Sequence, residues 1–139
     1  MIATTSNLLA GIETALAALP EGSEIVLQGL LWEEYEGLME ETLDQCRFKF
    51  LYDTGRLVVM SNSAEHEGVK ALLAALIMVL AEEVRLRIAP RASLTLKKER
   101  TAQGADPDEC YYIQNLDAIR NKKRIDLDID PAPDLVLEV

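Results

Sequence analysis

The first third of the sequence has no basic residues. Residues 1–46 contain nine Asp and Glu side chains without a single Lys or Arg, and the 139-residue chain has a formal net charge of −10. This composition disfavours nucleic acid as a partner, because Lys and Arg contacts to phosphates supply much of the affinity for it. Between Arg85 and Arg124, however, ten basic residues accompany five acidic ones. That segment predicts either a locally positive surface or an ordinary mixed, solvated one.

Cysteines and long apolar runs are also scarce. The two cysteines, Cys46 and Cys110, form no CxxC or Cys/His pattern, which argues against a zinc site or a disulfide framework. No Lys or Arg precedes the apolar residues at the N-terminus, as a secretory signal would require. The longest apolar run, Ala71 to Ala81, is shorter than the ~20 residues that cross a bilayer. We therefore expect a soluble, cytoplasmic protein with no membrane contact.

Several common functional motifs are missing. There is no GxSxG, P-loop or GxGxxG, so hydrolase-elbow, NTPase and dinucleotide-binding functions lack support. Asp126, Asp128 and Asp130 have D-x-D-x-D spacing, but Pro131 and Leu137 stand where a calcium loop needs Gly and Glu. The spacing therefore does not predict an EF-hand.

The pattern of apolar residues predicts one α/β (α+β) domain over residues 1–139, with an acidic section at 1–46 and a core at 47–139. No repeat or linker divides the chain. Hydrophobic periodicity and turn residues predict helices at 8–19, 30–42 and 64–86, a hairpin at 47–61, and strands at 24–29, 92–99, 107–115 and 135–139. Asn62 or Ser63 should cap the helix 64–86, whose apolar stripe, including Leu72 and Leu76, is expected to face the core.

Acidic residues cluster before the strand 107–115. Asp106, Asp108 and Glu109 surround one proline, so either the turn is simply solvated or a cation lies among these carboxylates. Glu138 interrupts the apolar strand 135–139, and a buried carboxylate there needs a proton, an ion pair or a metal. If the two strands are neighbours, Asp108 and Glu138 converge and can hold Mg²⁺, which takes one or two carboxylates plus waters.

The helix 64–86 offers two further candidates. At ~100° per residue, Glu65 and His66 should point toward the core side and Glu67 away from it. Either residue could complete a metal or water-activating site beside the two carboxylates. Alternatively, Glu65 only interacts with the helix dipole and His66 is an ordinary half-buried imidazole.

Four segments in their order resemble the Uma-two-type restriction endonuclease family of the PD-(D/E)XK nuclease superfamily. They are WEEYEGL, GRLVVMSNSAEHE, ADPDECYYIQN and PAPDLVLEV, and together they cover nearly the whole chain from Trp32 onward. The resemblance implies a restriction-endonuclease-like central mixed sheet flanked by helices. It also implies hydrolysis of DNA phosphodiester bonds with Mg²⁺ or Mn²⁺, Asp108 and Glu138 serving as metal ligands and Glu65 or His66 in support.

The sequence departs from the superfamily pattern at its end. The superfamily's lysine would fall two positions after Glu138, beyond Val139, so the domain is expected to be truncated at the C-terminus. Lys97 and Lys98 are candidates for phosphate binding, although either side chain could equally be solvated.

The alternative function is a catalytically inactive nuclease-fold module for dimerisation or nucleic-acid binding. An apolar sheet edge left open after Val139 predicts a homodimer.

Overall fold

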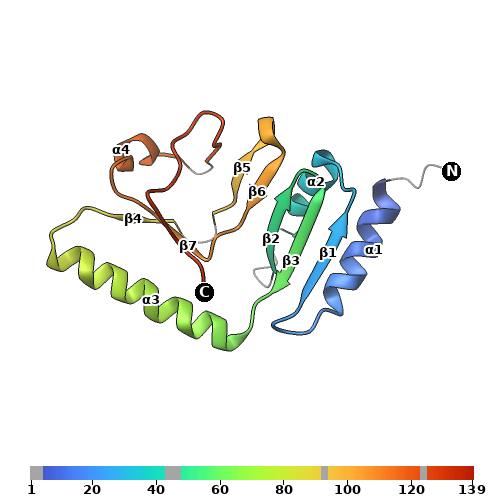
Figure 1. Cartoon of the computed structure of the whole chain (residues 1–139), viewed down its shortest axis with the longest axis horizontal. Helices are drawn as coiled ribbons and strands as arrows, with labels where there is room; N and C mark the ends of the chain where they lie inside the picture. The colour runs from blue at the N-terminus through green and yellow to red at the C-terminus, as the bar shows by residue number, and fades with distance from the viewer. Residues whose placement is uncertain (1–4, 43–47, 92–93, 123–124) are drawn as a thin grey trace.

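The computed structural model of the chain describes residues 5–42, 48–91, 94–122 and 125–139 (Figure 1). The elements in chain order are α1 (Thr5–Ala17), β1 (Glu24–Gln28), α2 (Trp32–Thr42), β2 (Phe48–Asp53), β3 (Arg56–Ser61), α3 (Ala64–Glu83), β4 (Ala89–Pro90), β5 (Leu96–Lys98), the 3₁₀ helix η1 (Glu99–Thr101), β6 (Gln103–Ala105), β7 (Glu109–Tyr112), α4 (Leu116–Ile119) and β8 (Leu135–Leu137). Within these ranges, no helix is both long and apolar enough to cross a membrane.

The larger sheet has five strands in the order β1-β3-β2-β6-β5, all paired antiparallel. The predicted hairpin forms β2 and β3, with Phe50 opposite Val59. Its turn places Thr54 at φ 44° and Gly55 at φ 94°, a region that suits glycine best. The sheet is therefore built around a hairpin whose turn is encoded locally.

The main core lies under this larger sheet and is closed by α1 and α2. Its buried residues are Ile12, Leu16, Leu19, Leu30, Tyr35, Leu38, Met39, Phe48, Phe50, Tyr52, Leu57 and Val59. Inside it, the rings of Tyr35 and Tyr52 stack with centroids 4.7 Å apart. The alternating Phe48, Phe50 and Tyr52 all face this core, as the sequence pattern predicts.

The smaller sheet has the order β4-β7-β8 and is also antiparallel. Its buried cluster is small, consisting of Tyr112, Ile119 and Ile125. A link of only three residues, Asp106 to Asp108, joins β6 of the larger sheet to β7 of the smaller one. In Figure 1, α3 leaves the larger sheet after β3 and runs along the side of the smaller one.

Helix α3 begins as predicted, because the Ser63 side chain accepts a hydrogen bond from the backbone N–H of His66. The expected direction of its apolar stripe is wrong. Leu72 is 71% exposed and Leu76 52% exposed, whereas Ala81 on another side is buried. Periodicity identifies an apolar face but not which side of the helix other elements cover, so the helix is rotated relative to the expectation.

The C-terminal strand also differs from its expected place. An apolar run such as 135–139 is typical of a central strand, but β8 lies at the edge of the smaller sheet. Its Leu135 and Val136 are 40% and 44% exposed.

Of the two cysteines, Cys110 is free and buried, while Cys46 lies outside the described residues.

Candidate metal and catalytic site

The link between the two sheets begins with Asp106, which continues the pairing of β6 with β2. Its backbone N–H donates to the Phe50 carbonyl at 3.0 Å, and its Oδ2 accepts from the Phe50 N–H at 3.0 Å. Burial raises the pKa of Asp106, even though that hydrogen bond acts in the opposite direction. Asp106 therefore attaches the link to β2 and fixes where the next acid, Asp108, is placed.

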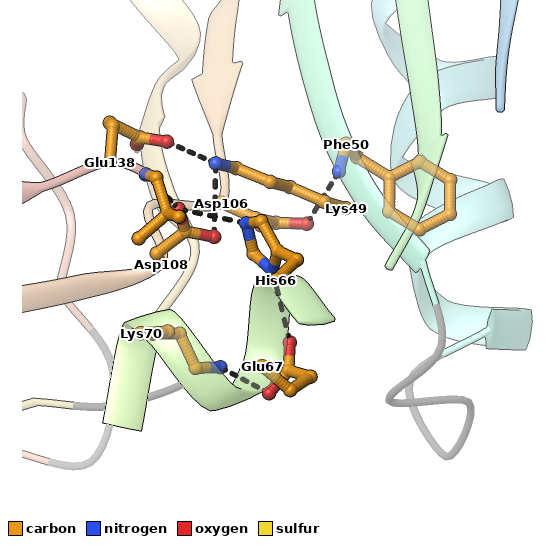
Figure 2. A network of polar contacts seen from close by, with 9 residues as sticks. Lys49, Phe50, His66, Glu67, Lys70, Asp106, Asp108 and Glu138 are labelled. Carbon is orange, nitrogen blue, oxygen red and sulfur yellow. Dashed lines mark hydrogen bonds and ion pairs between the residues drawn. The ribbon is translucent and has the colours of Figure 1, made fainter. Parts of the chain in front are cut away.

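Asp108 is the most enclosed carboxylate of the region, and both of its oxygens have partners (Figure 2). Lys49 Nζ lies 3.2 Å from Oδ1, and His66 Nε2 lies 3.3 Å from Oδ2. The Val139 N–H donates to Oδ2 at 2.8 Å. Burial by itself would raise the pKa of Asp108, but the hydrogen bond from Val139 and the neighbouring Lys49 ammonium outweigh it and lower that pKa.

Glu138 approaches the same point from β8. The antiparallel pairing of Glu109 with Leu137 brings the end of β8 back to the start of β7, which Asp108 precedes. The Glu138 carboxylate forms an ion pair with Lys49 Nζ, the atom that Asp108 also contacts. The Glu138 side chain is 55% exposed and that of Asp108 only 2%. The site is therefore closed at Asp108 and open to solvent at Glu138.

His66 connects the site to α3. The capping contact with Ser63 fixes its backbone in the first turn of the helix, and its ring contacts a carboxylate at each nitrogen. Nδ1 lies 3.4 Å from Glu67 Oε1, while Nε2 faces Asp108. Lys70 in turn donates to Glu67 at 2.9 Å. The structure thus places His66 beside Asp108, as the sequence predicts for this residue.

The other candidates lie elsewhere. The Glu65 side chain is exposed and makes no ion pair or hydrogen bond with any residue that the structure describes, so its supporting role stays a prediction. Its expected inward direction is wrong, because Glu67, not Glu65, is the acid beside His66. Lys97 contacts Glu36 at 3.2 Å and lies over the Tyr35 ring. The side-chain contacts of Lys97 are therefore with α2 and not with the two site carboxylates.

Sequence reasoning missed Lys49. The alternation of Phe48, Phe50 and Tyr52 in β2 already implies that Lys49 points to the opposite face of the sheet. That face is partly apolar, since Val58 of β3 is buried, so a lysine there signals an acidic partner. The partners could not be named, because Lys49 and Asp108 are 59 positions apart and the register of β2 with β6 brings them together.

The donor set fits a hard divalent cation. Two carboxylates already converge on one positively charged atom, and Mg²⁺ is typically held by one or two carboxylates with waters or phosphate oxygens completing the shell. In the part of the chain that the structure describes, no cluster of three His, Cys, Asp or Glu residues could hold a metal ion. Asp108 and Glu138 would therefore be the only carboxylate ligands among the described residues, with solvent or substrate supplying the rest.

Comparison with known proteins identifies a family for most of the chain. The model of the Uma2 family, described as a putative restriction endonuclease, matches residues 32–139. The chain belongs to this family. The Uma2 family is part of the restriction-endonuclease-like superfamily, and the two-sheet α+β architecture confirms the predicted fold class. No curated protein and no solved structure matches the chain.

Proposed function

We propose that the protein is a metal-dependent endonuclease that hydrolyses phosphodiester bonds in DNA, with Mg²⁺ or Mn²⁺ held by Asp108 and Glu138. Membership in the Uma2 family supports the nuclease class. The metal, the DNA substrate and the roles of the individual residues are our inference from the geometry and from the family.

One observation carries this proposal. Asp108 lies just before β7 and Glu138 just after β8, yet both carboxylates contact the same Lys49 Nζ atom (Figure 2). A cation between two like charges stabilises them, and Lys49 supplies that charge at the position that a divalent ion would take. The same pair is the one that the family resemblance assigns to the metal, so two independent lines of argument meet at one point of the fold.

The residues around this point have distinct roles. Asp108 is held rigidly by the Val139 N–H and by His66, so its oxygens have a fixed direction. Glu138 is half exposed and lies where a DNA backbone could approach from solvent. A divalent ion bound there would polarise a phosphate and lower the pKa of a bound water. His66 is a positioning residue, because its ring contacts the Asp108 carboxylate and helps to fix its direction.

The test is a plasmid-nicking assay with Mg²⁺ or Mn²⁺. Asp108→Asn and Glu138→Gln keep the shape of each side chain and remove its charge, so both should abolish nicking. Asp117→Asn is the matched control, because Asp117 is an exposed acid on α4 that pairs with Arg120. Equal nicking by the wild-type protein and both site variants would show a contaminating nuclease and refute the proposal.

A second candidate function is a catalytically inactive nuclease fold that binds nucleic acid. The observation that favours it is the Lys49 ammonium, which neutralises both carboxylates without any metal. An inactive module should bind a DNA duplex equally well with and without Mn²⁺ in an anisotropy titration. Metal-dependent binding would instead support the nuclease.

Self-association stays a prediction. Leu72 and Leu76 of α3 are both exposed and lie one helical turn apart, so they share one apolar surface. Such a surface is where a second copy of the chain could bind. Light scattering at several protein concentrations would detect a homodimer, and a monomer at the highest concentration would contradict it.

A further inference from the structure

The cation position of the candidate site is filled by a residue of the chain itself. Lys49 extends from β2 of the larger sheet, and its side chain is only 14% exposed. Its ammonium contacts Asp108 Oδ1 at 3.2 Å and forms an ion pair with Glu138 Oε2. In Figure 2, Nζ lies between the two carboxylates. A side chain from β2 of the larger sheet therefore holds together two acids that flank β7 and β8 of the smaller one.

A divalent ion and this ammonium cannot share the position. Mg²⁺ binds carboxylate oxygens at about 2.0–2.1 Å, so an ion held by Asp108 and Glu138 would occupy the region where Lys49 Nζ now lies. Like charges also repel at such short distance, more strongly than in water because Asp108 is nearly enclosed. Binding of the ion therefore requires the lysine side chain to move away.

We propose that Lys49 is a resident competitor of the divalent ion, and that the ion displaces its ammonium toward the incoming DNA phosphate. This inference rests on the proposed metal site and deepens it. The lysine stem is flexible and its ammonium is a compact charge that binds phosphate readily. Movement of the lysine would couple metal binding to substrate binding. Without metal, the ammonium pairs with the two acids; with metal bound, it is free to contact the DNA phosphate.

Competition predicts how metal affinity changes when the lysine is removed. Lys49→Met should bind Mn²⁺ about tenfold more tightly than the wild-type protein, because the ion no longer has to break the two ion pairs. Lys49→Arg keeps the charge and should bind Mn²⁺ as weakly as the wild type. Lys97→Met is the control, since Lys97 is a partly buried lysine paired with Glu36 outside the site. Electron paramagnetic resonance of free Mn²⁺ measures all four affinities without any DNA cleavage.

The outcomes separate this inference from the proposed function. The competition is supported if Lys49→Met is the one variant that binds Mn²⁺ more tightly than the wild type. It is also supported if Lys49→Met binds Mn²⁺ while the wild type binds none at the concentrations used. Equal or weaker binding by Lys49→Met, with clear binding by the wild type, overturns the competition and leaves the metal site standing. Binding by neither protein overturns both. Lys49→Gln is neutral and more polar, and it replaces Lys49→Met if that variant fails to fold.

The coupling to phosphate has its own measurement. Anisotropy titration of a DNA duplex, with Ca²⁺ replacing Mn²⁺ to prevent cleavage, should show an ion-dependent gain in affinity for the wild-type protein. Lys49→Met should lose most of this gain, whereas Lys49→Arg, which keeps the positive charge, should keep it. An undiminished gain in Lys49→Met would show that the displaced ammonium does not contact the DNA.

Discussion

The two sheets differ in how they are held together. Among the described residues, the larger sheet, with α1 and α2, closes around a cluster of twelve buried core residues, whereas the buried cluster of the smaller sheet, with α3 and α4, has three. Most of the helix that runs beside the smaller sheet is exposed, and Ala81 is the buried residue of α3. We call the larger sheet with α1 and α2 the first region, and the smaller sheet with α3 and α4 the second region. The first is stabilised mainly by apolar burial, and the second depends more on hydrogen bonds and ion pairs.

This difference matters because the candidate site lies where the two regions meet. Lys49 belongs to the first region, while Asp108, Glu138 and His66 belong to the second (Figure 2). A local opening of the second region would separate the acids from Lys49 without unfolding the first. The stability of the site is therefore expected to follow that of the weaker region.

The largest effect is expected from truncating the two cores in turn. Leu57→Ala in the first region should reduce the free energy of unfolding by about 4 kcal/mol, and Ile119→Ala in the second by about 2 kcal/mol. Both side chains are 0% exposed, so the difference in cost reflects the larger buried cluster around Leu57. Denaturant unfolding measures the two losses.

Amide hydrogen exchange then shows which part of the chain each substitution destabilises. Leu57→Ala should reduce protection throughout the chain, whereas Ile119→Ala should reduce it in β7 and leave β3 nearly unchanged. Equal loss in β3 and β7 for Ile119→Ala would mean that the two regions unfold as one cooperative unit.

A second test uses the close approach of the Tyr35 side chain to Gly104 in the first region. A Cβ added at Gly104 would lie 2.7 Å from Tyr35 Cζ, and the Tyr35 ring is held by its stack on Tyr52. Gly104→Ala should therefore destabilise the protein by about 3 kcal/mol through overpacking. Gly68→Ala in α3 is the matched control, because nothing lies within 4 Å of its added Cβ. That change should instead stabilise the helix by about 1 kcal/mol.

The clash explanation has a direct check by thermal unfolding. In a Tyr35→Leu background, Gly104→Ala should cost much less than in the wild type, because the ring that it meets is gone. An equal cost in both backgrounds would locate the strain in the backbone of β6 and not in the contact with Tyr35.

Local features of this fold could be read from the sequence, and long-range ones could not. The hairpin of β2 and β3 was predictable because alternation and the turn around Gly55 are properties of neighbouring residues. The existence of α3 and its cap at Ser63 was predictable for the same reason. The buried side of α3 was not, since it depends on which distant elements cover the helix.

The site shows the same division. The residue pattern and the family resemblance both indicated Asp108 and Glu138, and the pairing of β7 with β8 explains how they come together. Lys49 was missed because its partners depend on the register of β2 with β6, which no local pattern specifies. A half-buried lysine opposite an aromatic face indicates that an acid must be near, but only the fold identifies which one.

A smaller effect is expected from the cap that begins the second region. Ser63 Oγ accepts from the His66 N–H at 3.1 Å, so Ser63→Ala should cost about 1 kcal/mol, measured by denaturant unfolding. Ser63→Asp keeps an acceptor at this position and should restore most of the loss. If both variants were equally destabilised, the role of Ser63 would be packing and not capping.

The smallest effect concerns the start of β8 and depends on pH. Asp134 Oδ2 accepts from the backbone N–H groups of Ile113 at 2.6 Å and Gln114 at 3.0 Å. The hydrogen bond from Ile113, assisted by those from its neighbours, lowers the pKa of Asp134. Because the folded pKa lies below the unfolded one, this contribution to stability is present above about pH 4 and is lost as the pH falls through the folded pKa.

An NMR titration following the Ile113 amide measures this pKa directly. The wild-type amide shift should change with a midpoint below about 3.9, the ordinary value for Asp, and Asp134→Asn should remove the transition. Asp117→Asn is the control and should leave the Ile113 curve unchanged, because Asp117 pairs with Arg120 on α4. A wild-type midpoint at or above the ordinary value would show that Asp134 does not anchor β8. The second region would then depend on its ion pairs at Lys49 more than on this loop.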